Sequence, residues 1–230
     1  MKLRGIPCNT IFYEYGVFGF CAYKKIIKNF FVRKNNILRV GAGTVLSKDF
    51  FLENKHKTDF GIVYYFADPH DDDYEALVHQ IIKTLDISSD AHTPIIISIS
   101  LSFPPDMIAE ISAHKNCDAI FVRPCITWDQ MPSDAQKIFF RMTKSPFSVP
   151  GGGFVFGKYV KTFSLEWLRQ AKKYSTGKPI IIGGGILGPK DVMDFAKLGA
   201  SGLIIDRAIL LRFWNIPRIV KASRKIFKNK

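Results

Sequence analysis

Three consecutive glycines, Gly183 to Gly185, follow a short apolar run and precede a segment that opens with Pro189. Glycines carry no Cβ, so their backbone N–H groups can approach a ligand closely. Proline is favoured in the first turn of a helix, and the positive end of a helix attracts anions. This order of residues predicts a turn that holds a phosphate group. The alternative is a tight connection between a strand and a helix that binds nothing.

Two further segments have the chemistry of an anion site. Asp206 and Arg207 follow the apolar run 202–205, and an arginine can hold a phosphate through charge-assisted hydrogen bonds. The same pair could instead form a structural salt bridge. The glycine-rich stretch 151–157 contains Gly152 and Gly153 and is followed by Lys158 and Lys161. Three such segments together favour phosphate binding more than any one of them does.

Acid/base chemistry is most plausible in the stretch "ADPHDDDYEA", residues 67–76, which contains four aspartates and one histidine. Asp68 and His70 lie where a predicted strand ends, so they are the candidates for taking up or releasing a proton. A divalent cation is a second interpretation. The third is structural: acids before a helix cap its free N–H groups. The sequence favours capping for the cluster as a whole.

These residues need a framework, and the chain alternates short β-branched runs with amphipathic stretches, as parallel sheets built from βα units do. Strands are expected at 36–45, 60–66, 93–101, 118–124, 178–184 and 201–207, with a weaker one at 9–15. Residues 148–157 form either a short eighth strand or a loop. Helices are expected at 71–86, 104–115, 133–144, 164–175 and 189–199. Seven or eight strands predict an α/β (β/α)8 TIM barrel, complete or reduced, over an open doubly wound sheet. In such barrels the active site lies at the carboxyl ends of the strands.

Length and composition suit one domain over residues 1–230. The chain has 230 residues, of which 47% are hydrophobic, enough for a substantial core. It contains no run of eighteen apolar residues and no leader pattern, so a cytoplasmic protein is expected. The four cysteines show neither a CxxC pair nor histidines at the spacing of metal ligands. Neither a disulfide framework nor a metal site is therefore predicted.

The net charge of +13 comes from the two ends of the chain. Residues 1–40 carry eight Lys or Arg against one acid, and residues 207–230 carry eight against none. Within 23–34 and 217–230 the basic side chains fall on one helical face and the apolar ones on the other. The structural interpretation is two packed helices with solvated outer faces. The functional one is an anionic partner at the basic ends: lipid, nucleic acid or an acidic protein.

Residues 151–210, "GGGFVFGKYVKTFSLEWLRQAKKYSTGKPIIIGGGILGPKDVMDFAKLGASGLIIDRAIL", resemble the C-terminal part of dihydroorotate dehydrogenases. That family has, in this order, a G-G-L-S-G motif, a helix, a P-I-I-G-x-G-G-I strand and a helix ending in A-G-A. The segments 59–86 and 93–122 look like its preceding strand units. The resemblance implies a (β/α)8 barrel that holds FMN and oxidises its substrate by hydride transfer, and it makes a homodimer an expectation.

The resemblance also assigns roles to individual residues. Gly152 and Gly153 would approach the ribityl chain, Gly184 and Gly185 would meet the phosphate, and Asp206-Arg207 would stand where the family completes the phosphate cup. Ser98 falls where the family has a lysine that contacts the flavin ring. The family's substrate-binding asparagines and its Cys or Ser base have no counterpart at 65–70 or 124–125.

The sequence therefore predicts a divergent, shortened dihydroorotate dehydrogenase-like oxidoreductase with FMN as cofactor, whose classical activity the missing residues call into question. Asp68, His70 and Ser98 are its candidate catalytic residues. Two alternatives stay open. One is a barrel that binds a phosphorylated ligand and catalyses non-redox chemistry. The other is a non-catalytic descendant that acts as a binding or assembly module through its basic terminal helices.

Overall fold

The computed structural model describes residues 37–40, 61–66, 68–69, 73–88, 94–205 and 212–227. Within these ranges six parallel strands form one sheet, in the order β1-β2-β3-β4-β7-β8. The strands are β1 (Ile37–Val40), β2 (Gly61–Tyr65), β3 (Ile95–Ile99), β4 (Ala119–Val122), β7 (Ile180–Gly183) and β8 (Gly202–Ile204). All six fall inside the ranges expected from the sequence, so the α/β class with a parallel sheet is confirmed.

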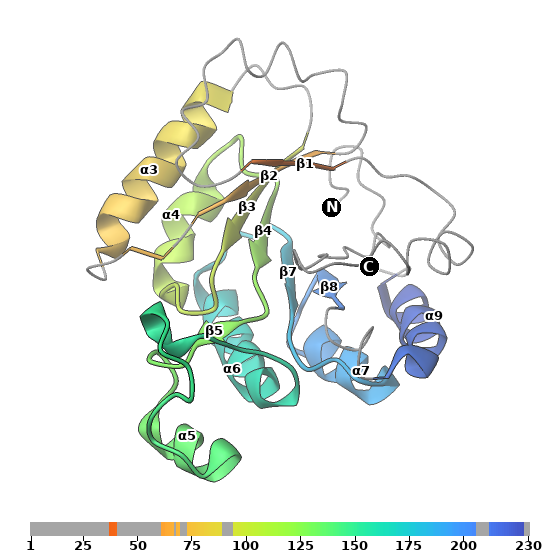
Figure 1. The fold of residues 1–230 in the computed structure, drawn as a ribbon. Coiled ribbons are helices and arrows are strands. Elements are labelled where there is room, and N and C mark those ends of the chain that lie inside the picture. Colours follow the sequence, from red (N-terminus) through yellow and green to blue (C-terminus); the bar gives the residue numbers. More distant parts are fainter. Residues whose placement is uncertain are drawn as a thin grey trace.

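The helices line one side of this sheet (Figure 1). They are α3 (Tyr74–Ile87), α4 (Ile108–Ala113), α6 (Lys158–Tyr174), α7 (Pro189–Lys197) and α9 (Ile216–Phe227). Each contacts the next around the sheet, α3 with α4, α4 with α6, α6 with α7 and α7 with α9. Short 3-10 turns, η3 (Pro105–Met107) and η5 (Phe213–Asn215), precede α4 and α9. The arrangement is that of a βα barrel, and in the described part the sheet is open between β8 and β1.

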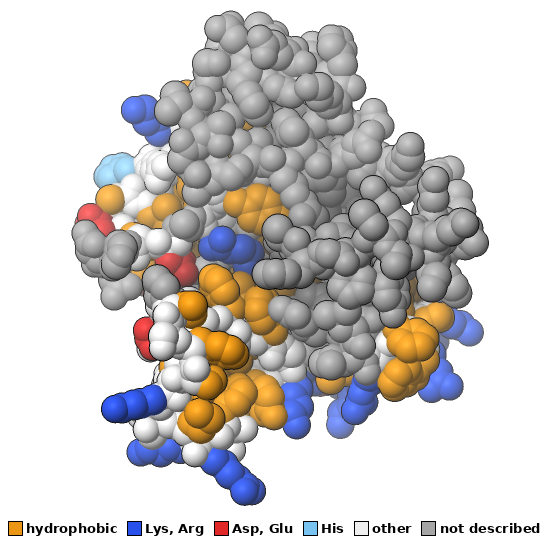
Figure 2. Space-filling model, viewed as in Figure 1, with side chains coloured by type: hydrophobic (Ala, Val, Ile, Leu, Met, Phe, Trp, Pro, Cys, Tyr) orange, Lys and Arg blue, Asp and Glu red, His pale blue; other side chains and the backbone are white. Residues whose placement is uncertain are grey.

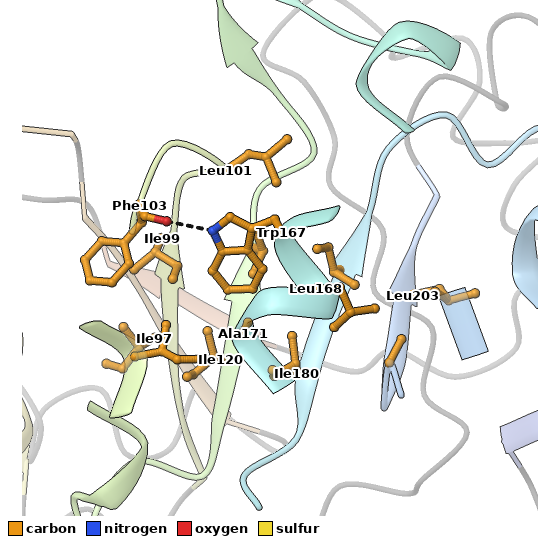
Figure 3. Packing of buried hydrophobic residues seen from close by; sticks show 14 of the residues in the cluster. Ile97, Ile99, Leu101, Phe103, Ile120, Trp167, Leu168, Ala171, Ile180 and Leu203 are labelled. Carbon is orange, nitrogen blue, oxygen red and sulfur yellow. Dashed lines mark hydrogen bonds between the residues drawn. The ribbon is translucent and has the colours of Figure 1, made fainter. Parts of the chain in front are cut away.

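The main core lies between the strands and these helices (Figure 3). Ile97, Ile120 and Ile180, on three neighbouring strands, are fully buried on this face. Helix α6 presents the facing apolar stripe, since its buried residues recur at helical spacing from Val160 to Ala171. Burial of each such large aliphatic side chain contributes about 1.5–3 kcal/mol.

The opposite face of the sheet carries its own, smaller apolar cluster. Because side chains alternate along a strand, this cluster takes the residues between those of the main core. Its members are Val63, Ile96, Ala119, Phe121, Ile181 and Ile204, with Tyr65 packed beside them. In a βα barrel this is the inner face, and its continuation toward the carboxyl ends of the strands is where a site is expected.

Between β4 and β7 the chain leaves the main sheet. Strands β5 (Ile126–Thr127) and β6 (Phe154–Val155) pair antiparallel with each other, and α5 (Ser133–Phe140) and η4 (Pro150–Gly152) lie between them. Of the two alternatives for 148–157, a short eighth strand or a loop, the barrel strand is wrong: of the described residues there, only two form a strand, and their partner is β5. The glycines of this stretch adopt positive φ angles, which favour a loop.

Helix boundaries differ from the expected ones for local reasons. Helix α3 begins at Tyr74 because the Asp73 side chain accepts a hydrogen bond from Ala76 N at 2.9 Å, which confirms capping for this member of the acidic cluster. Helix α5 ends at Phe140 because Arg141 is left-handed, with φ 55°. Helix α6 begins at Lys158, six residues before the expected start. The weak strand at 9–15 lies outside the described residues, and a single domain over 1–230 stays a prediction.

Candidate site at the inner rim of the sheet

Polar residues replace the apolar ones where the inner face reaches the carboxyl ends of β2, β3 and β4. Ser98 pairs in register with Tyr65 on one side and Phe121 on the other. Two residues further along, Ser100 and Arg123 follow the ends of their strands on the same face, since side chains alternate. The inner rim is defined here as Asp68, Ser98, Ser100 and Arg123, contributed by three adjacent strands and their following loops.

Hydrogen bonds tie the three strand ends together. The Ser100 hydroxyl donates to the Asp68 carboxylate, which joins the loop after β2 to the end of β3. Arg123 Nη2 donates to the carbonyl of Phe66 at 2.7 Å, and the backbone N–H of Arg123 donates to the carbonyl of Ile99 at 2.9 Å. The Arg123 guanidinium, which follows β4, is thereby held against the carbonyl of Phe66 at the end of β2, across β3.

Two polar atoms of the inner rim, Ser98 Oγ and Arg123 Nε, are buried and have no hydrogen-bond partner in the part of the chain that the structure describes. Ser98 is fully buried. A buried donor that lacks a partner costs about 1–3 kcal/mol, and more when it is charged. An anionic or hydrogen-bonding ligand over the rim would satisfy both atoms. Among the described residues no group of three or more His, Cys, Asp or Glu side chains could hold a metal ion.

The glycine turn after β7 lies against the first turn of α6. A Cβ on Gly184 would stand 2.8 Å from Ser164 Oγ, and one on Gly185 would stand 2.7 Å from the carbonyl oxygen of Gly157. Both glycines have positive φ angles, 110° and 67°. The chain therefore needs glycine at these positions for packing and backbone conformation, whether or not a phosphate binds there.

The amino end of α7 is satisfied by the chain itself. The Asp191 carboxylate accepts hydrogen bonds from Leu187 N at 2.8 Å and Gly188 N at 2.9 Å. Lys161 Nζ lies 2.5 Å from Asp191 Oδ1 and 2.8 Å from Asp194 Oδ2. The sequence pattern did not reveal this pairing between α6 and α7. It places two carboxylates beside the helix end where a phosphate was expected.

Gly152 and Gly153 lie elsewhere, beside β5. A Cβ on Gly152 would stand 2.8 Å from Trp128 Cβ, and the Gly153 carbonyl accepts a hydrogen bond from Trp128 N at 2.9 Å. Ser145 Oγ donates to the Gly152 carbonyl at 2.5 Å. These contacts hold the loop 145–153 closed on β5.

The structure thus brings Asp68 and Ser98 to one rim and places the two glycine pairs against different partners. His70, Asp206, Arg207 and the basic stretch 23–34 lie outside the described residues. Ser100 and Arg123 are the rim residues to which the sequence assigned no role. The available signal was a charged residue directly after the apolar run "AIFV" in a strand whose end was expected at the site.

Residues 217–227 of the basic stretch belong to α9, as expected, and 228–230 lie outside the described residues. Its apolar residues Ile219 and Phe227 are buried, and the exposed basic residues are Arg218, Lys221, Arg224 and Lys225. No helix among the described residues is long and apolar enough to cross a membrane.

No protein-family model matches the chain, and no curated protein matches it in sequence. Solved structures do. DHODH from Eimeria tenella, in complex with ferulenol, superposes with a TM-score of 0.53 at 16% identity, over 81% of this chain and 56% of that one. The chain therefore spans a little over half the length of this neighbour.

Two other similar structures are more distant. The tryptophan synthase alpha-subunit from Pyrococcus furiosus has a TM-score of 0.47 at 14% identity, over 92% of this chain and 72% of that one. FabK from Thermotoga maritima has a TM-score of 0.43 at 10% identity, over 76% and 42%. At such identities the likeness to DHODH shows the fold alone. The chain has an α/β (β/α)8 barrel fold that is incomplete in its described part.

Proposed function

We propose that this barrel binds a phosphorylated ligand over the inner rim, and that FMN is the first such ligand to test. One observation carries the proposal: the guanidinium of Arg123 is fixed at the carboxyl end of the sheet, and among the described residues neither its buried Nε nor the buried hydroxyl of Ser98, on the neighbouring strand, has a hydrogen-bond partner. A half-buried guanidinium with a spare donor is suited to an anion.

The resemblance over 151–210 and the barrel fold support FMN among phosphorylated ligands. When bound, FMN would supply a ring that accepts a hydride. The positive charge that the family carries at the Ser98 position would come here from Arg123, one strand further along the sheet. The guanidinium would lie at the flavin ring and balance negative charge on its reduced form, and the Phe66 carbonyl would keep it in place. Asp68, positioned by Ser100, would hold or release a proton at its carboxylate, and His70 would assist there.

The fit to FMN differs between the two ends of the ligand. At the inner rim, Arg123, Ser98 and Asp68 offer the donors and the acceptor that a flavin ring requires. At the amino end of α7, Asp191 already accepts from the available amides, and Gly184 and Gly185 pack against α6. A phosphate grip by Gly184, Gly185, Asp206 and Arg207, with Gly152 and Gly153 at the ribityl chain, stays part of the proposal and needs its own test.

The test starts with the visible spectrum of the purified protein, followed by titration with FMN. Flavin bands at about one per chain, or saturable binding of added FMN, are expected. Arg123→Gln should weaken binding about 10–100-fold, because it removes a charge-assisted contact. Lys83→Gln, which removes an exposed lysine of the outer helix α3, is the matched control and should bind like the wild type. A colourless protein that ignores FMN overturns the flavin assignment.

A thermal-shift screen with phosphorylated metabolites then separates the remaining functions. A ligand that binds only the folded state raises the melting temperature, which would indicate a phosphorylated-ligand enzyme with non-redox chemistry. If neither FMN nor any phosphorylated compound raises it, the inner rim is not a binding site. The amino end of α7, where Asp191 already accepts hydrogen bonds from Leu187 N and Gly188 N, would then favour the alternative of a non-catalytic binding or assembly module.

For that module the exposed basic face of α9 supplies a docking surface for an anionic partner: lipid, nucleic acid or an acidic protein. Salt-sensitive retention on heparin, reduced by Lys221→Gln with Arg224→Gln, is the expected sign. A cytoplasmic location and a homodimer complete the proposal. They are tested by localising a tagged full chain and by measuring its mass in solution.

A further inference from the structure

The segment between β4 and β7 carries an exposed apolar patch that neither the barrel core nor the inner rim explains. Ile138 of α5 is 74% exposed, and Phe147 and Phe154 are each 66% exposed. Met142 and Val149 are exposed as well. The apolar patch consists of Ile138, Met142, Phe147, Val149 and Phe154. Large exposed side chains of this kind, gathered in one segment, mark an interaction surface.

The patch is held in shape by contacts beneath it. Phe140 of α5 packs on Trp128, with ring centroids 5.1 Å apart, and on Tyr159 at 4.8 Å. A Cβ on Gly153 would lie within 4 Å of both Phe147 and Val149, so these two side chains converge on the residue that precedes Phe154. In Figure 1, α5 projects at the bottom of the molecule, away from the sheet. The patch therefore lies on a segment that projects from the barrel and has its own aromatic packing.

Positive charge borders the patch on one side. Figure 2 shows hydrophobic side chains gathered at the lower left, with Lys and Arg side chains bordering them below. From Pro132 to Val160 the chain has four basic residues and a single acid, Asp134. The basic rim consists of Lys137, Arg141, Lys144 and Lys158, all of them exposed.

We propose that this surface docks on an anionic lipid bilayer, with the apolar patch entering the headgroup region and the basic rim meeting the lipid phosphates. Apolar residues that project from a basic surface bind membranes in this way, and their affinity depends on anionic lipid. No spanning helix is needed for such peripheral contact.

The observations favour a bilayer over the other occupants. A second copy of the chain, docked symmetrically, would bring one basic rim against another, with Asp134 as the only acid between Pro132 and Val160 to offset the repulsion. Single-stranded nucleic acid stacks on aromatic rings, but Ile138, Met142 and Val149 offer no ring. An anionic bilayer can accept the aliphatic side chains of the patch among its headgroups and can bind the basic rim through its phosphates.

The test is flotation of the full chain with vesicles of phosphatidylcholine plus phosphatidylserine, and with vesicles of phosphatidylcholine alone. The wild type should float with the first and bind the second at least about tenfold more weakly. A patch variant, Phe147→Ser with Val149→Ser and Phe154→Ser, should bind phosphatidylserine vesicles at least about tenfold more weakly than the wild type. A rim variant, Lys137→Gln with Arg141→Gln and Lys144→Gln, should bind more weakly and with less dependence on salt.

The matched control is Phe213→Ser with Trp214→Ser, which removes two exposed aromatic residues next to the basic helix α9. It should bind vesicles like the wild type. Loss of binding in this control, with binding kept in the patch variant, would place docking at α9 and overturn the proposal. So would a wild type that ignores phosphatidylserine vesicles at low salt.

Further measurements distinguish a loss of membrane contact from unfolding and from a change in oligomeric state. Phe147→Leu with Phe154→Leu keeps an apolar patch and should keep vesicle binding, and thermal melts establish that each variant is folded. If the patch variant instead turns a dimer into a monomer in sedimentation, the patch is a subunit interface and the proposal fails. Vesicle binding is measured without FMN or any other ligand, so its outcome is independent of the function proposed for the inner rim.

Discussion

Lys161 of α6 donates hydrogen bonds to both Asp191 and Asp194 of α7, at 2.5 and 2.8 Å. All three side chains are largely shielded from solvent. The lysine thus links two neighbouring helices of the barrel and neutralises the acids at the start of α7. Because the charge of Lys161 is already paired with two carboxylates, we assign Arg123 rather than Lys161 to the ligand.

Replacing this lysine should destabilise the protein. Lys161→Met leaves two neighbouring carboxylates without their cation and is expected to lower the free energy of unfolding by about 1–2 kcal/mol at neutral pH. Urea denaturation measures it. Lys158→Met, which removes an exposed lysine one helical turn earlier, should change stability by less than about 0.5 kcal/mol. Equal losses in both variants would contradict a structural role for the pair.

The pH dependence of that loss has a definite sign. Hydrogen bonds from Lys161 hold the pKa of Asp194 below its usual value. Burial lowers the pKa of Lys161, but its hydrogen bonds to Asp191 and Asp194 outweigh this and leave it raised. The stabilisation is therefore complete between about pH 4 and pH 10, the unfolded values of the two groups, and declines beyond both limits. The difference between wild type and Lys161→Met should shrink as the pH falls below about 4.

Gly184 offers a test of the glycine turn as a packing element. Gly184→Ala forces a Cβ against Ser164 Oγ at a φ of 110°, so a loss of about 1–3 kcal/mol is expected. Gly188→Ala is the control, since nothing lies within 4 Å of its added Cβ and its backbone is extended. Thermal unfolding compares the two. Adding Ser164→Ala to Gly184→Ala should restore part of the loss, and a purely additive double variant would refute the contact.

Trp167 should report on the junction between α6 and the loop after β3. Its Nε1 donates to the Phe103 carbonyl at 2.6 Å, and both residues are buried (Figure 3). Trp167→Phe leaves that carbonyl unsatisfied, which should cost about 1–3 kcal/mol. Trp214→Phe changes an exposed tryptophan and should leave the urea midpoint within error. Similar losses in the two variants would contradict a specific role for the Phe103 bond.

Alkaline conditions should unfold the protein through two buried acids. Burial raises the pKa of Cys117 to about 12, and burial also raises the pKa of Tyr64 to about 12, against the opposing hydrogen bond of Ser88. A raised folded pKa gives stability that is full below the unfolded value and is lost above it. Stability should therefore fall between about pH 8.5 and pH 12, by up to about 1.4 kcal/mol per pH unit for each group. Urea denaturation of Cys117→Ala should show a shallower fall, and an unchanged slope would contradict this account.

The pattern of the parallel strands could be read from the sequence because each buried strand is a short run of β-branched residues, as in 95–99. The apolar face of α9 followed from helical spacing. The start of α6 could not be predicted from the sequence, because its first turn is polar outside and its glycine N-cap, Gly157, provides no capping side chain. The pairing of β6 with β5 also escaped, since a two-residue strand has no periodicity to detect.

The candidate site divides in the same way. Asp68 and Ser98 could be placed because they stand at or near the ends of expected strands. Ser100 and Arg123 acquire a role only when β2, β3 and β4 are paired, because their partners Asp68 and Phe66 are far away in sequence. The ion pairs of Lys161 with Asp191 and Asp194 likewise depend on how α6 packs against α7. A residue's neighbours across elements are set by tertiary packing, which a linear pattern does not contain.

The direct pairing of β4 with β7 has a consequence for the order of folding. Ile120 lies opposite Ile180, whereas Ile96 pairs with Ala119 and Ile181 with Gly202. The longer intervening chain adds about 1 kcal/mol of loop-closure entropy to the step that joins β4 to β7. We expect the unit from β2 to β4 to form early and the unit of β7 and β8 to dock onto it late, a sequence that stopped-flow fluorescence of Trp167 would resolve as a final slow phase. The pairing of β4 with β7, which the chain from 123 to 179 connects, is then the last strand pairing to form.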